Sequence, residues 1–310
     1  MVSIVFKAGA GDADDWQRQL SQRIPDLDWR VWPDVGDPAT VHFILAFKVE
    51  RGFFAQFPNL KGILAAGAGG DGLFADPDLP RGLPIARIVD PHMTQQMVQW
   101  AAYGVLHFFR RFDEYRALQA KAEWQELGSP TRHPNRVGVL GFGEIGGAIG
   151  RGLLGLGFFV QGWTMTPRDL GPIDNLAGLD HLDAFLASSP FLICSLPLTP
   201  ATRGLLNRER LSKLPKGAVV LNLARGGHVV TDDLLALLEE GHLAGAVLDV
   251  TDPEPLPPQH RLWRHPNVII TPHESGLTTP ETAADQIAAN VKRILAGEPV
   301  QNPVDITRGY

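Results

Sequence analysis

The sequence lacks the features that mark a secreted, membrane-bound or cysteine-rich metal protein. Its 310 residues include one cysteine, Cys194, which excludes an internal disulfide framework and indicates a reducing compartment. No run approaches the roughly 18 to 20 apolar residues that span a bilayer, and the N-terminus lacks the basic and apolar regions of a signal peptide. We therefore expect a cytoplasmic protein. Because Cys194 lies in the apolar run FLICSLP, we expect it to be a buried strand residue rather than a nucleophile.

An excess of charge of one sign is also lacking. The 28 Lys and Arg residues are dispersed among 34 Asp and Glu residues, and the net charge is −6. This pattern favours neither a nucleic-acid partner nor a membrane surface. An anionic ligand would therefore have to be attracted by a local arginine.

The alternation of short β-branched runs with helical patterns predicts two α/β domains with parallel sheets. The first series has five expected strands, at residues 3–7, 29–32, 41–47, 60–66 and 84–89. A long helix over about 94–123 connects the two series. The second series has six expected strands, a number that suits a doubly wound dinucleotide fold, at residues 136–140, 158–163, 191–196, 218–223, 246–250 and 268–271. A last helix over 281–295 is expected to return to the first domain.

A glycine-rich segment, VGVLGFGEIG at 137–146, places the pattern G-x-G-x-x-G between an apolar strand and a helical pattern. In this context Gly141 permits a tight turn, Gly143 lets the backbone approach a pyrophosphate, and Gly146 allows close packing of helix on strand. The helix N-terminus supplies the anion site. A glycine-rich turn without a ligand is the alternative, and the flanking strand and helix favour the dinucleotide.

Polar residues follow several predicted strands, where ligands bind in open α/β sheets. Arg225, Asp249 and His273 each come at a strand end, and Glu254 follows Asp249 by five residues. A guanidinium can hold a carboxylate and polarise a carbonyl, and a histidine oriented by a carboxylate can give a proton. Taken singly, three of these four residues have a specific structural alternative: Asp249 as a helix N-cap, Glu254 as a solvated loop residue, and Arg225 as part of a surface turn.

Long stretches of the chain resemble the D-isomer-specific 2-hydroxyacid dehydrogenase family and, within it, the glyoxylate/hydroxypyruvate reductase A group. Besides the glycine-rich segment, the matching stretches are LAAGAGGD (64–71), VLHFFRRFDEY (105–115), SLPLTPAT (195–202), LNLARGGHVV (221–230), GAVLDV (245–250), EPLP (254–257), LWRHPNVIITPH (262–273) and GEPVQNPVDITRGY (297–310). The resemblance implies an enzyme that reduces a small 2-keto acid, such as glyoxylate or hydroxypyruvate, to the 2-hydroxy acid with NAD(P)H.

The resemblance also implies roles for individual residues. Arg225 would bind and polarise the substrate, and Glu254 and His273 would form the acid/base pair. Asp249 would bind the nicotinamide carboxamide. The substrate carboxylate would be bound by backbone amides of the loop formed by Ala68, Gly69 and Gly70. No metal is implied, and further cofactor contacts are expected at Glu144, Ile145, Leu196, Pro197, Thr202, Leu223, Ala224 and Ser275.

The family fold implies a discontinuous flavodoxin-like substrate domain, residues 1–99 and 278–310, and a Rossmann dinucleotide-binding domain over residues 100–277. In the family the region around 105–120 forms a dimerisation arm, and this segment carries much apolar surface here, so a homodimer is expected. Trp124 lies where some relatives extend a tryptophan towards the partner's active site. Ordinary interface packing of Trp124 is the alternative.

The second expected strand of the cofactor domain predicts which dinucleotide is used. An NAD-selective site normally has Asp or Glu at that strand end, where the carboxylate repels a 2′-phosphate. This sequence instead has two hydroxyls, Thr164 and Thr166, and the guanidinium of Arg168. NADP(H) is therefore favoured, and NAD(H) is possible. Relatives that prefer NADPH often have arginine at the position of Met165. The alternative is that Arg168 is solvated and both cofactors are accepted.

Other functions on the same scaffold are a dinucleotide-sensing binding protein and another 2-hydroxyacid dehydrogenase, such as the phosphoglycerate type. Glu254, where related formate dehydrogenases have glutamine, counts against a formate reaction. Many relatives have small apolar residues after the histidine, whereas residues 274–276 here are Glu-Ser-Gly. The sequence does not specify which 2-keto acid is used. We expect Phe47, Lys48 and Met93 to line the substrate pocket.

Overall fold

The computed structural model describes residues 1–7, 13–132 and 134–306. The chain forms two compact units. Unit 1 consists of Met1–Met93 and Leu277–Tyr310, so it is built from both ends of the sequence, and unit 2 consists of Thr94–Gly276. Each unit has its own parallel sheet and its own hydrophobic core.

Unit 1 has a parallel five-stranded sheet in the order β2-β1-β3-β4-β5. This order reverses between β1 and β3, as in flavodoxin-like folds, so the predicted fold class is confirmed. The sheet has all five strands of the first predicted series: β1 (Val2–Lys7), β2 (Leu27–Val31), β3 (Phe43–Ala46), β4 (Gly62–Ala65) and β5 (Ile85–Ala86).

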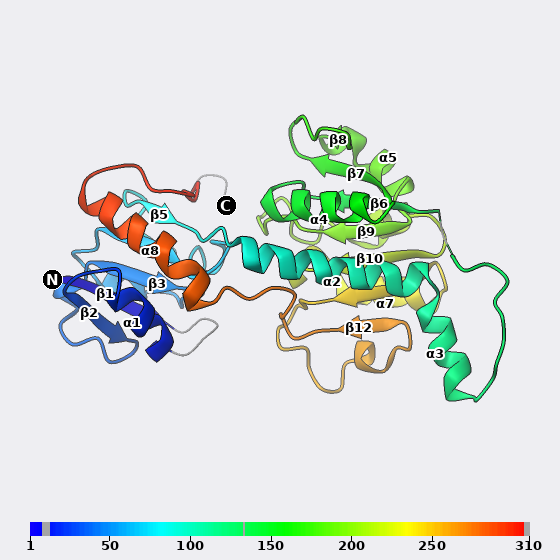
Figure 1. Cartoon of the computed structure of the whole chain (residues 1–310), viewed down its shortest axis with the longest axis horizontal. Coiled ribbons are helices and arrows are strands. Elements are labelled where there is room, and N and C mark those ends of the chain that lie inside the picture. The colour runs from blue at the N-terminus through cyan, green and yellow to red at the C-terminus, as the bar shows by residue number, and fades with distance from the viewer. Residues whose placement is uncertain (8–12, 133, 307–310) are drawn as a thin grey trace. The chain divides into compact units, whose positions relative to one another are not determined.

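The two faces of this sheet are covered differently. Helices α1 (Ala13–Ser21) and α8 (Pro280–Leu295) lie on one face, as Figure 1 shows. There they bury Ile4 and Phe6 of β1. Val5 points to the opposite face, which is covered by loops and the short helix η2 (Phe54–Gln56). This alternation follows from the two-residue period of a strand. Another short helix, η1, spans Pro38–Thr40.

Unit 2 has a parallel seven-stranded sheet in the order β12-β11-β10-β9-β6-β7-β8. The direction of winding reverses between β6 and β9, which is where dinucleotides bind in such sheets. The sequence predicted six of these strands and missed β8, because Asp174–Ala177 has no run of β-branched residues. The strands are β6 (Arg136–Leu140), β7 (Phe159–Thr164), β8 (Asp174–Ala177), β9 (Phe191–Cys194), β10 (Ala218–Asn222), β11 (Leu243–Leu248) and β12 (Val268–Ile270).

Helices cover both faces of the seven-stranded sheet. Figure 1 shows α2 (Pro91–Phe109) and α4 (Glu144–Gly155) in front of it. Helix α2 approaches the strands closely, because a Cβ atom at Gly104 would lie 2.7 Å from Leu221 of β10. Leu residues of the other helices form the core on the opposite face. These helices are α5 (Leu182–Ala187), α6 (Arg208–Leu211), α7 (Thr231–Glu239) and the short η5 (Arg261–Arg264). Two more short helices are η3 (Leu179–His181) and η4 (Gly226–His228). Cys194 is buried in β9, as predicted.

The single helix predicted over 94–123 is wrong, because the structure has two helices there. α2 ends at Phe109, and α3 spans Phe112–Ala120. Between them Arg111 has a φ of 61°, a left-handed conformation that ends a helix. The side chain of Arg111 donates to Glu114 and to the carbonyl of Leu127, which holds this break. The apolar pattern runs on through the break and therefore gave no sign of it.

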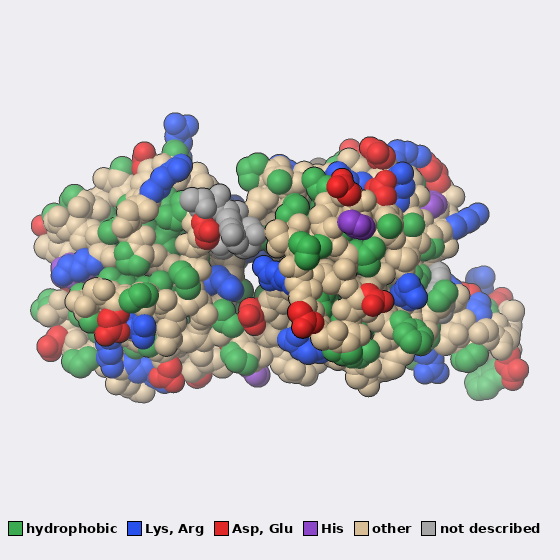
Figure 2. Space-filling view, turned by 90° about the horizontal axis from the view of Figure 1, so that it is seen from above, with side chains coloured by type: hydrophobic (Ala, Val, Ile, Leu, Met, Phe, Trp, Pro, Cys, Tyr) green, Lys and Arg blue, Asp and Glu red, His purple; other side chains and the backbone are tan. Residues whose placement is uncertain are grey.

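The surface carries charges of both signs. Figure 2 shows Lys and Arg side chains interspersed with Asp and Glu side chains on the visible face. Within the described ranges, no helix has the length and apolar character needed to cross a membrane. The same part of the chain contains no group of three or more His, Cys, Asp or Glu side chains arranged to hold a metal ion.

Candidate functional site

The glycine-rich loop lies between β6 and α4, at the point where the sheet reverses its winding. Gly141 has a φ of 96°, which glycine adopts without strain. A Cβ atom at Gly146 would lie 1.9 Å from the carbonyl oxygen of Gly141, so no side chain fits at this position. The hydroxyl of Ser195, which follows β9, donates to the Gly141 carbonyl at 2.5 Å. The loop is thereby fixed to the neighbouring strand end.

The N-terminus of α4 fits a pyrophosphate. Gly143 is the N-cap residue, and no side chain caps the helix. A Cβ atom at Gly143 would meet no other atom within 4 Å, so the backbone borders open space here. Glu144 and Ile145 form the start of the first turn, whose amides have no partners within the helix. An anion that enters this space can accept hydrogen bonds from those amides.

The end of β7 carries the residues predicted to select the cofactor. The Thr164 side chain is buried, and its hydroxyl donates to the carbonyl of Thr166 at 2.7 Å, with Asn175 Oδ1 at 3.0 Å. Thr164 therefore shapes the turn. Thr166 and Arg168 are exposed. Asn175 donates to the carbonyl of Arg168 at 2.7 Å and so fixes the backbone from which the guanidinium extends.

The loop after β9 holds three of the predicted cofactor residues. Leu196 is buried against the glycine-rich loop, since a Cβ atom at Gly141 would lie 3.0 Å from Leu196. The buried Thr202 donates from its hydroxyl to the carbonyl of Pro197 at 2.7 Å and accepts from the Thr199 amide at 2.8 Å. Thr202 thus closes this loop through its side chain.

Arg225 follows β10 directly after the buried residues Leu223 and Ala224. The guanidinium is half-buried and donates to the carbonyl of Ala224 at 2.7 Å. Gly226 lets this loop approach the segment after β11, because a Cβ atom there would lie 2.0 Å from the Thr251 carbonyl. The Arg225 loop therefore packs against the segment that leads to Glu254.

His273 and Glu254 meet as the sequence predicted for an acid/base pair. The Nδ1 atom of His273 lies 2.7 Å from Oε1 of Glu254. The two side chains are 31% and 43% exposed, so solvent and a ligand can reach them. Since the carboxylate accepts, Nδ1 carries the proton in this contact, and Nε2 is then the atom suited to exchange a proton with a substrate.

Asp249 holds the loop that carries the histidine. Its side chain is 1% exposed, and Oδ1 accepts from the Thr271 hydroxyl at 2.6 Å and the Glu274 amide at 2.8 Å. The Ser275 amide lies 3.0 Å from both carboxylate oxygens. The amide of His273 donates to the Asp249 carbonyl at 2.8 Å, and His273 has a φ of 60°. Asp249 thus stabilises a backbone conformation that is uncommon outside glycine.

Two residues of this network were missed by the sequence reasoning. The indole of Trp100 on α2 donates to the Thr271 hydroxyl at 3.0 Å, and that hydroxyl donates to Asp249. Thr271 gave a usable signal, since it is a hydroxyl residue at a strand end two positions before His273. Trp100 gave none, because its place in the apolar pattern of α2 is that of an ordinary packing residue.

The residues predicted to contact the substrate from unit 1 follow strand ends, apart from Met93, which lies in the first turn of α2. The loop Ala68 to Gly70 follows β4, and Phe47 follows β3. The Phe47 ring lies 3.3 Å from where a Cβ atom at Gly67 would stand, so it packs beside that loop. Lys48 is exposed. Met93 is buried, and its sulfur accepts from the Thr278 hydroxyl at 3.3 Å.

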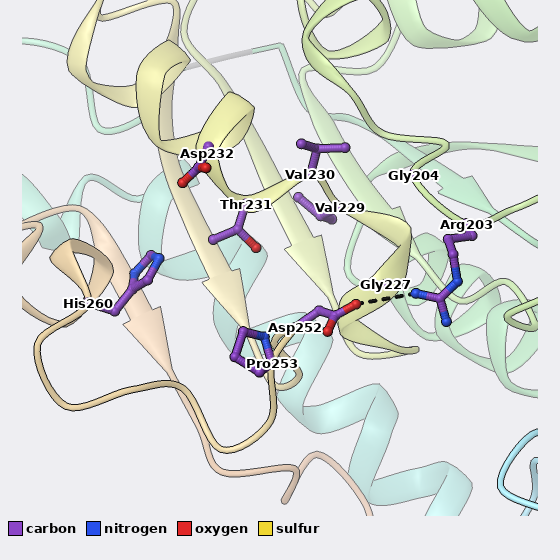
Figure 3. A pocket seen from close by; sticks show the side chains of 10 residues that line it. All are labelled: Arg203, Gly204, Gly227, Val229, Val230, Thr231, Asp232, Asp252, Pro253 and His260. Atoms are coloured by element: carbon purple, nitrogen blue, oxygen red, sulfur yellow. Dashed lines mark hydrogen bonds and ion pairs between the residues drawn. The ribbon is translucent and has the colours of Figure 1, made fainter. Parts of the chain in front are cut away.

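A surface pocket of about 420 Å³ lies in unit 2 beside the turn that follows Arg225 (Figure 3). Arg203 and Asp252 form an ion pair at 3.3 Å on its wall. Gly227 and Val229 also line it. None of the predicted site residues is among its lining residues, so the sequence did not predict this pocket.

Comparisons with known proteins agree with this geometry. The model of the D-isomer specific 2-hydroxyacid dehydrogenase NAD binding domain matches residues 103–275. The chain is 40% identical to glyoxylate/hydroxypyruvate reductase A of Serratia proteamaculans and 37% identical to that of Yersinia enterocolitica, and each match covers 100% of both proteins.

Two solved structures show the same likeness. A D-isomer specific 2-hydroxyacid dehydrogenase from Xanthobacter autotrophicus Py2, in complex with NADPH and MES, has a TM-score of 0.93 at 43% identity, covering 100% of this chain and 99% of the other. An NADPH-dependent glyoxylate/hydroxypyruvate reductase from Sinorhizobium meliloti, in complex with NADP and sulfate, has a TM-score of 0.91 at 32% identity, covering 99% and 100%.

Proposed function

Because the chain belongs to the D-isomer specific 2-hydroxyacid dehydrogenase family, we propose that it reduces glyoxylate, hydroxypyruvate or a closely similar 2-keto acid with NADPH. One structural observation carries the proposal. His273 and Glu254 form a hydrogen-bonded pair at the carboxyl edge of a dinucleotide-binding sheet, next to the loop of Arg225. A proton donor and a guanidinium are the groups that reduction of a keto acid requires beside the hydride source.

The cofactor supplies the hydride that the keto carbon accepts. The guanidinium of Arg225 binds the substrate carboxylate and polarises the keto oxygen, on which negative charge develops. His273 gives that oxygen a proton from Nε2, which yields the hydroxyl group. Glu254 keeps the ring in one orientation and offsets the charge of the ring before the proton is transferred.

The residues present fit the cofactor along the whole edge of the sheet. The first-turn amides of α4, beside Gly143, bind the pyrophosphate. Thr166 and Arg168 bind the 2′-phosphate, and this favours NADP(H) over NAD(H). One carboxylate oxygen of Asp249 accepts three hydrogen bonds from the histidine loop. The other accepts from Ser275 at 3.0 Å and keeps capacity for the nicotinamide carboxamide.

For substrate binding in unit 1, the backbone amides of Ala68, Gly69 and Gly70 are assigned to the carboxylate. Phe47 and Lys48 follow β3 at the same edge of that sheet. Together with Met93, they are assigned to the part of the pocket that contacts the substituent of the keto acid.

We further propose a homodimer that uses the segment 103–124. Four aromatic side chains of this segment are exposed, and Trp124 is 99% exposed. A second copy of the chain would cover this apolar surface. The proposed location is the cytoplasm, for which the evidence is the single cysteine, buried in β9.

The test is a comparison of kcat/KM for glyoxylate, hydroxypyruvate, pyruvate and bulkier 2-keto acids with NADPH. We expect the small 2-keto acids to be reduced with the highest efficiency. Tight binding of NADPH without turnover of any keto acid would reject the reductase and favour a dinucleotide-sensing protein. His273→Ala is the matched control, since it removes the proton donor and leaves the glycine-rich loop intact.

A further inference from the structure

A second histidine, His228, lies beneath the Arg225 loop and has no part in the chemistry above. Its side chain is completely buried in the short helix η4. Its neighbours Gly227 and Val229 line the surface pocket of Figure 3, whereas His228 itself is not exposed there. The two ring nitrogens of a buried imidazole must find their hydrogen-bond partners within the protein, so these partners indicate the role of the side chain.

Both ring nitrogens of His228 face backbone carbonyl oxygens. Nδ1 lies 3.0 Å from the oxygen of Arg225, and Nε2 lies 3.2 Å from the oxygen of Pro197. A carbonyl oxygen can only accept, so each nitrogen must carry a proton to form its bond. A neutral imidazole carries one such proton and an imidazolium carries two. A ring that forms both hydrogen bonds at once is therefore the charged one.

The surroundings of the ring agree with this charge. Burial by itself lowers the pKa of His228, but the adjacent Cys194 and the carbonyls of Pro197 and Arg225 outweigh burial and raise the pKa above its ordinary value. Cys194 is fully buried as well. Acceptors on both sides of a buried cation compensate part of the hydration that it loses.

The ring connects two loops that come from neighbouring strands. Pro197 lies in the loop after β9, and Arg225 in the loop after β10. Each carbonyl has a second donor: Thr202 at 2.7 Å for Pro197, and Asn222 at 2.9 Å for Arg225. Replacement of His228 thus leaves both carbonyls hydrogen-bonded, and we expect the variants to fold. What they lose is the side-chain link between the Pro197 and Arg225 carbonyls, while the backbone hydrogen bond from the Gly204 amide to the Gly227 carbonyl at 2.8 Å remains.

We propose that His228 is a positioning residue for Arg225, which fixes the guanidinium for the substrate by donating hydrogen bonds from both ring nitrogens to the Arg225 and Pro197 carbonyls. This inference rests on the role of Arg225 in the proposed function. His228 can affect the rate without touching the substrate. A shift of about 1 Å in a group that orients the substrate can cost about 10²-fold in rate, even when the change that causes it lies far from the reacting atoms.

The first experiment compares two substitutions. His228→Leu removes both donors, and we expect at least a tenfold increase in KM for the keto acid, while the Kd of NADPH changes less than threefold. His228→Gln keeps an amide donor and should recover part of this loss. An equal change in the keto-acid KM and the NADPH Kd, or no recovery with glutamine, would overturn the proposal. Leu186→Val in the buried core of α5 serves as the control for lost stability without a changed KM.

The second experiment measures the protonation state of the His228 ring. Nitrogen-15 NMR of histidine-labelled protein at about pH 7, assigned by the signals lost in His228→Gln, should show His228 protonated on both nitrogens, whereas exposed histidines are mostly neutral. A neutral ring would overturn the proposal even if the variants lose activity. If the wild type reduces no keto acid, the proposed function fails, and the NMR result still decides whether the ring holds the two loops.

Discussion

His273 and Glu254 are joined by a hydrogen bond of 2.7 Å between Nδ1 and Oε1, although they come from loops after different strands. His273 is held by the backbone of Asp249 on one side and by the carboxylate of Glu254 on the other. The ring therefore has one orientation, in which the Nδ1–H group points to Glu254. Nε2 is therefore the atom that can transfer a proton. Because His273 transfers the proton and Glu254 only orients the ring, we expect replacement of His273 to cost more activity than replacement of Glu254.

His273→Ala should lower kcat far more than it changes the KM of NADPH. General acid catalysis is typically worth about 10² to 10⁴ in rate, and the proton is transferred in the chemical step. Glu254→Gln should lose less, because an amide oxygen still accepts from Nδ1 but does not offset the charge of the ring. Steady-state kinetics at saturating NADPH measure both. A kcat for His273→Ala that equals the wild-type value at every pH would reject the assignment.

Arg225→Ala should lower kcat/KM for the keto acid by roughly two orders of magnitude or more, which corresponds to about 3 kcal/mol of transition-state stabilisation. The Kd of NADPH should be nearly unchanged, since this side chain is assigned to the substrate. Arg225→Lys is the comparison variant. It keeps the charge without the planar fork and should recover little of the loss. Near-normal kcat/KM in the alanine variant would contradict the role.

The parallel sheets were predictable because their strands are buried on both faces and therefore read as short apolar runs. β8 was missed since Asp174–Ala177 is an edge strand without such a run. The break at Arg111 was missed because a left-handed residue depends on side-chain contacts, here to Glu114 and to the Leu127 carbonyl, which the periodicity does not contain. His273 follows one predicted strand and Glu254 comes shortly after the end of another. The sequence therefore predicted that both residues lie at the same edge of the sheet.

Residues that act through other residues were much harder to find in the sequence. Trp100 and His228 are defined by the hydrogen bonds that they form across the fold. Thr164 was expected to donate to a phosphate, and the structure shows its hydroxyl donating to the carbonyl of Thr166. A position next to a site can be inferred from a strand end, whereas the direction of a hydroxyl cannot.

Glu114 gives the helix pair α2–α3 a pH-dependent contribution to stability. The hydrogen bond from Arg111 and the charge of Arg132 hold the pKa of Glu114 at about 2, below the ordinary 4.5. The depressed pKa means that this contribution is fully present above about pH 4.5 and is lost as the pH falls towards 2. Glu114→Gln should lower the free energy of unfolding at pH 7.

Denaturant unfolding at a series of pH values measures this difference. The gap between the wild type and Glu114→Gln should be constant above about pH 5 and shrink as the pH falls further. Glu126→Gln, on an exposed residue, serves as the control and should show no such gap. A gap that grows on acidification would contradict the assignment to Glu114.

The proposed homodimer predicts twice the chain mass of 33.8 kDa at micromolar concentration by light scattering. Trp124→Ala and Phe112→Ala should each weaken association, because these exposed side chains would be buried against the second copy. If Trp124 reaches the partner's active site, its replacement should also lower kcat/KM at concentrations where the variant remains dimeric. If Trp124 only packs in the interface, its replacement should weaken association and leave kcat/KM of the dimer unchanged. A wild-type monomer would rule out both.

The choice of dinucleotide depends on Arg168, which the turn after β7 places on the surface. Asn175 holds its backbone carbonyl at 2.7 Å, and Thr164 holds the adjoining turn. A charge-assisted contact contributes roughly 1.5 to 3 kcal/mol. Arg168→Ala should therefore lower kcat/KM with NADPH by at least about tenfold and spare NADH, which has no 2′-phosphate.

Two further variants make this prediction sharper. Met165→Arg places a second guanidinium on the exposed turn, where it can bind the 2′-phosphate, so the preference for NADPH should rise. Arg264→Ala removes an exposed arginine from η5 and should leave the ratio of the two cofactors unchanged. Equal losses with both cofactors in Arg168→Ala would remove this residue from the site. A wild-type preference for NADH would overturn the assignment of the cofactor. The turn would then reject the 2′-phosphate of NADPH without the carboxylate on which NAD selectivity normally depends.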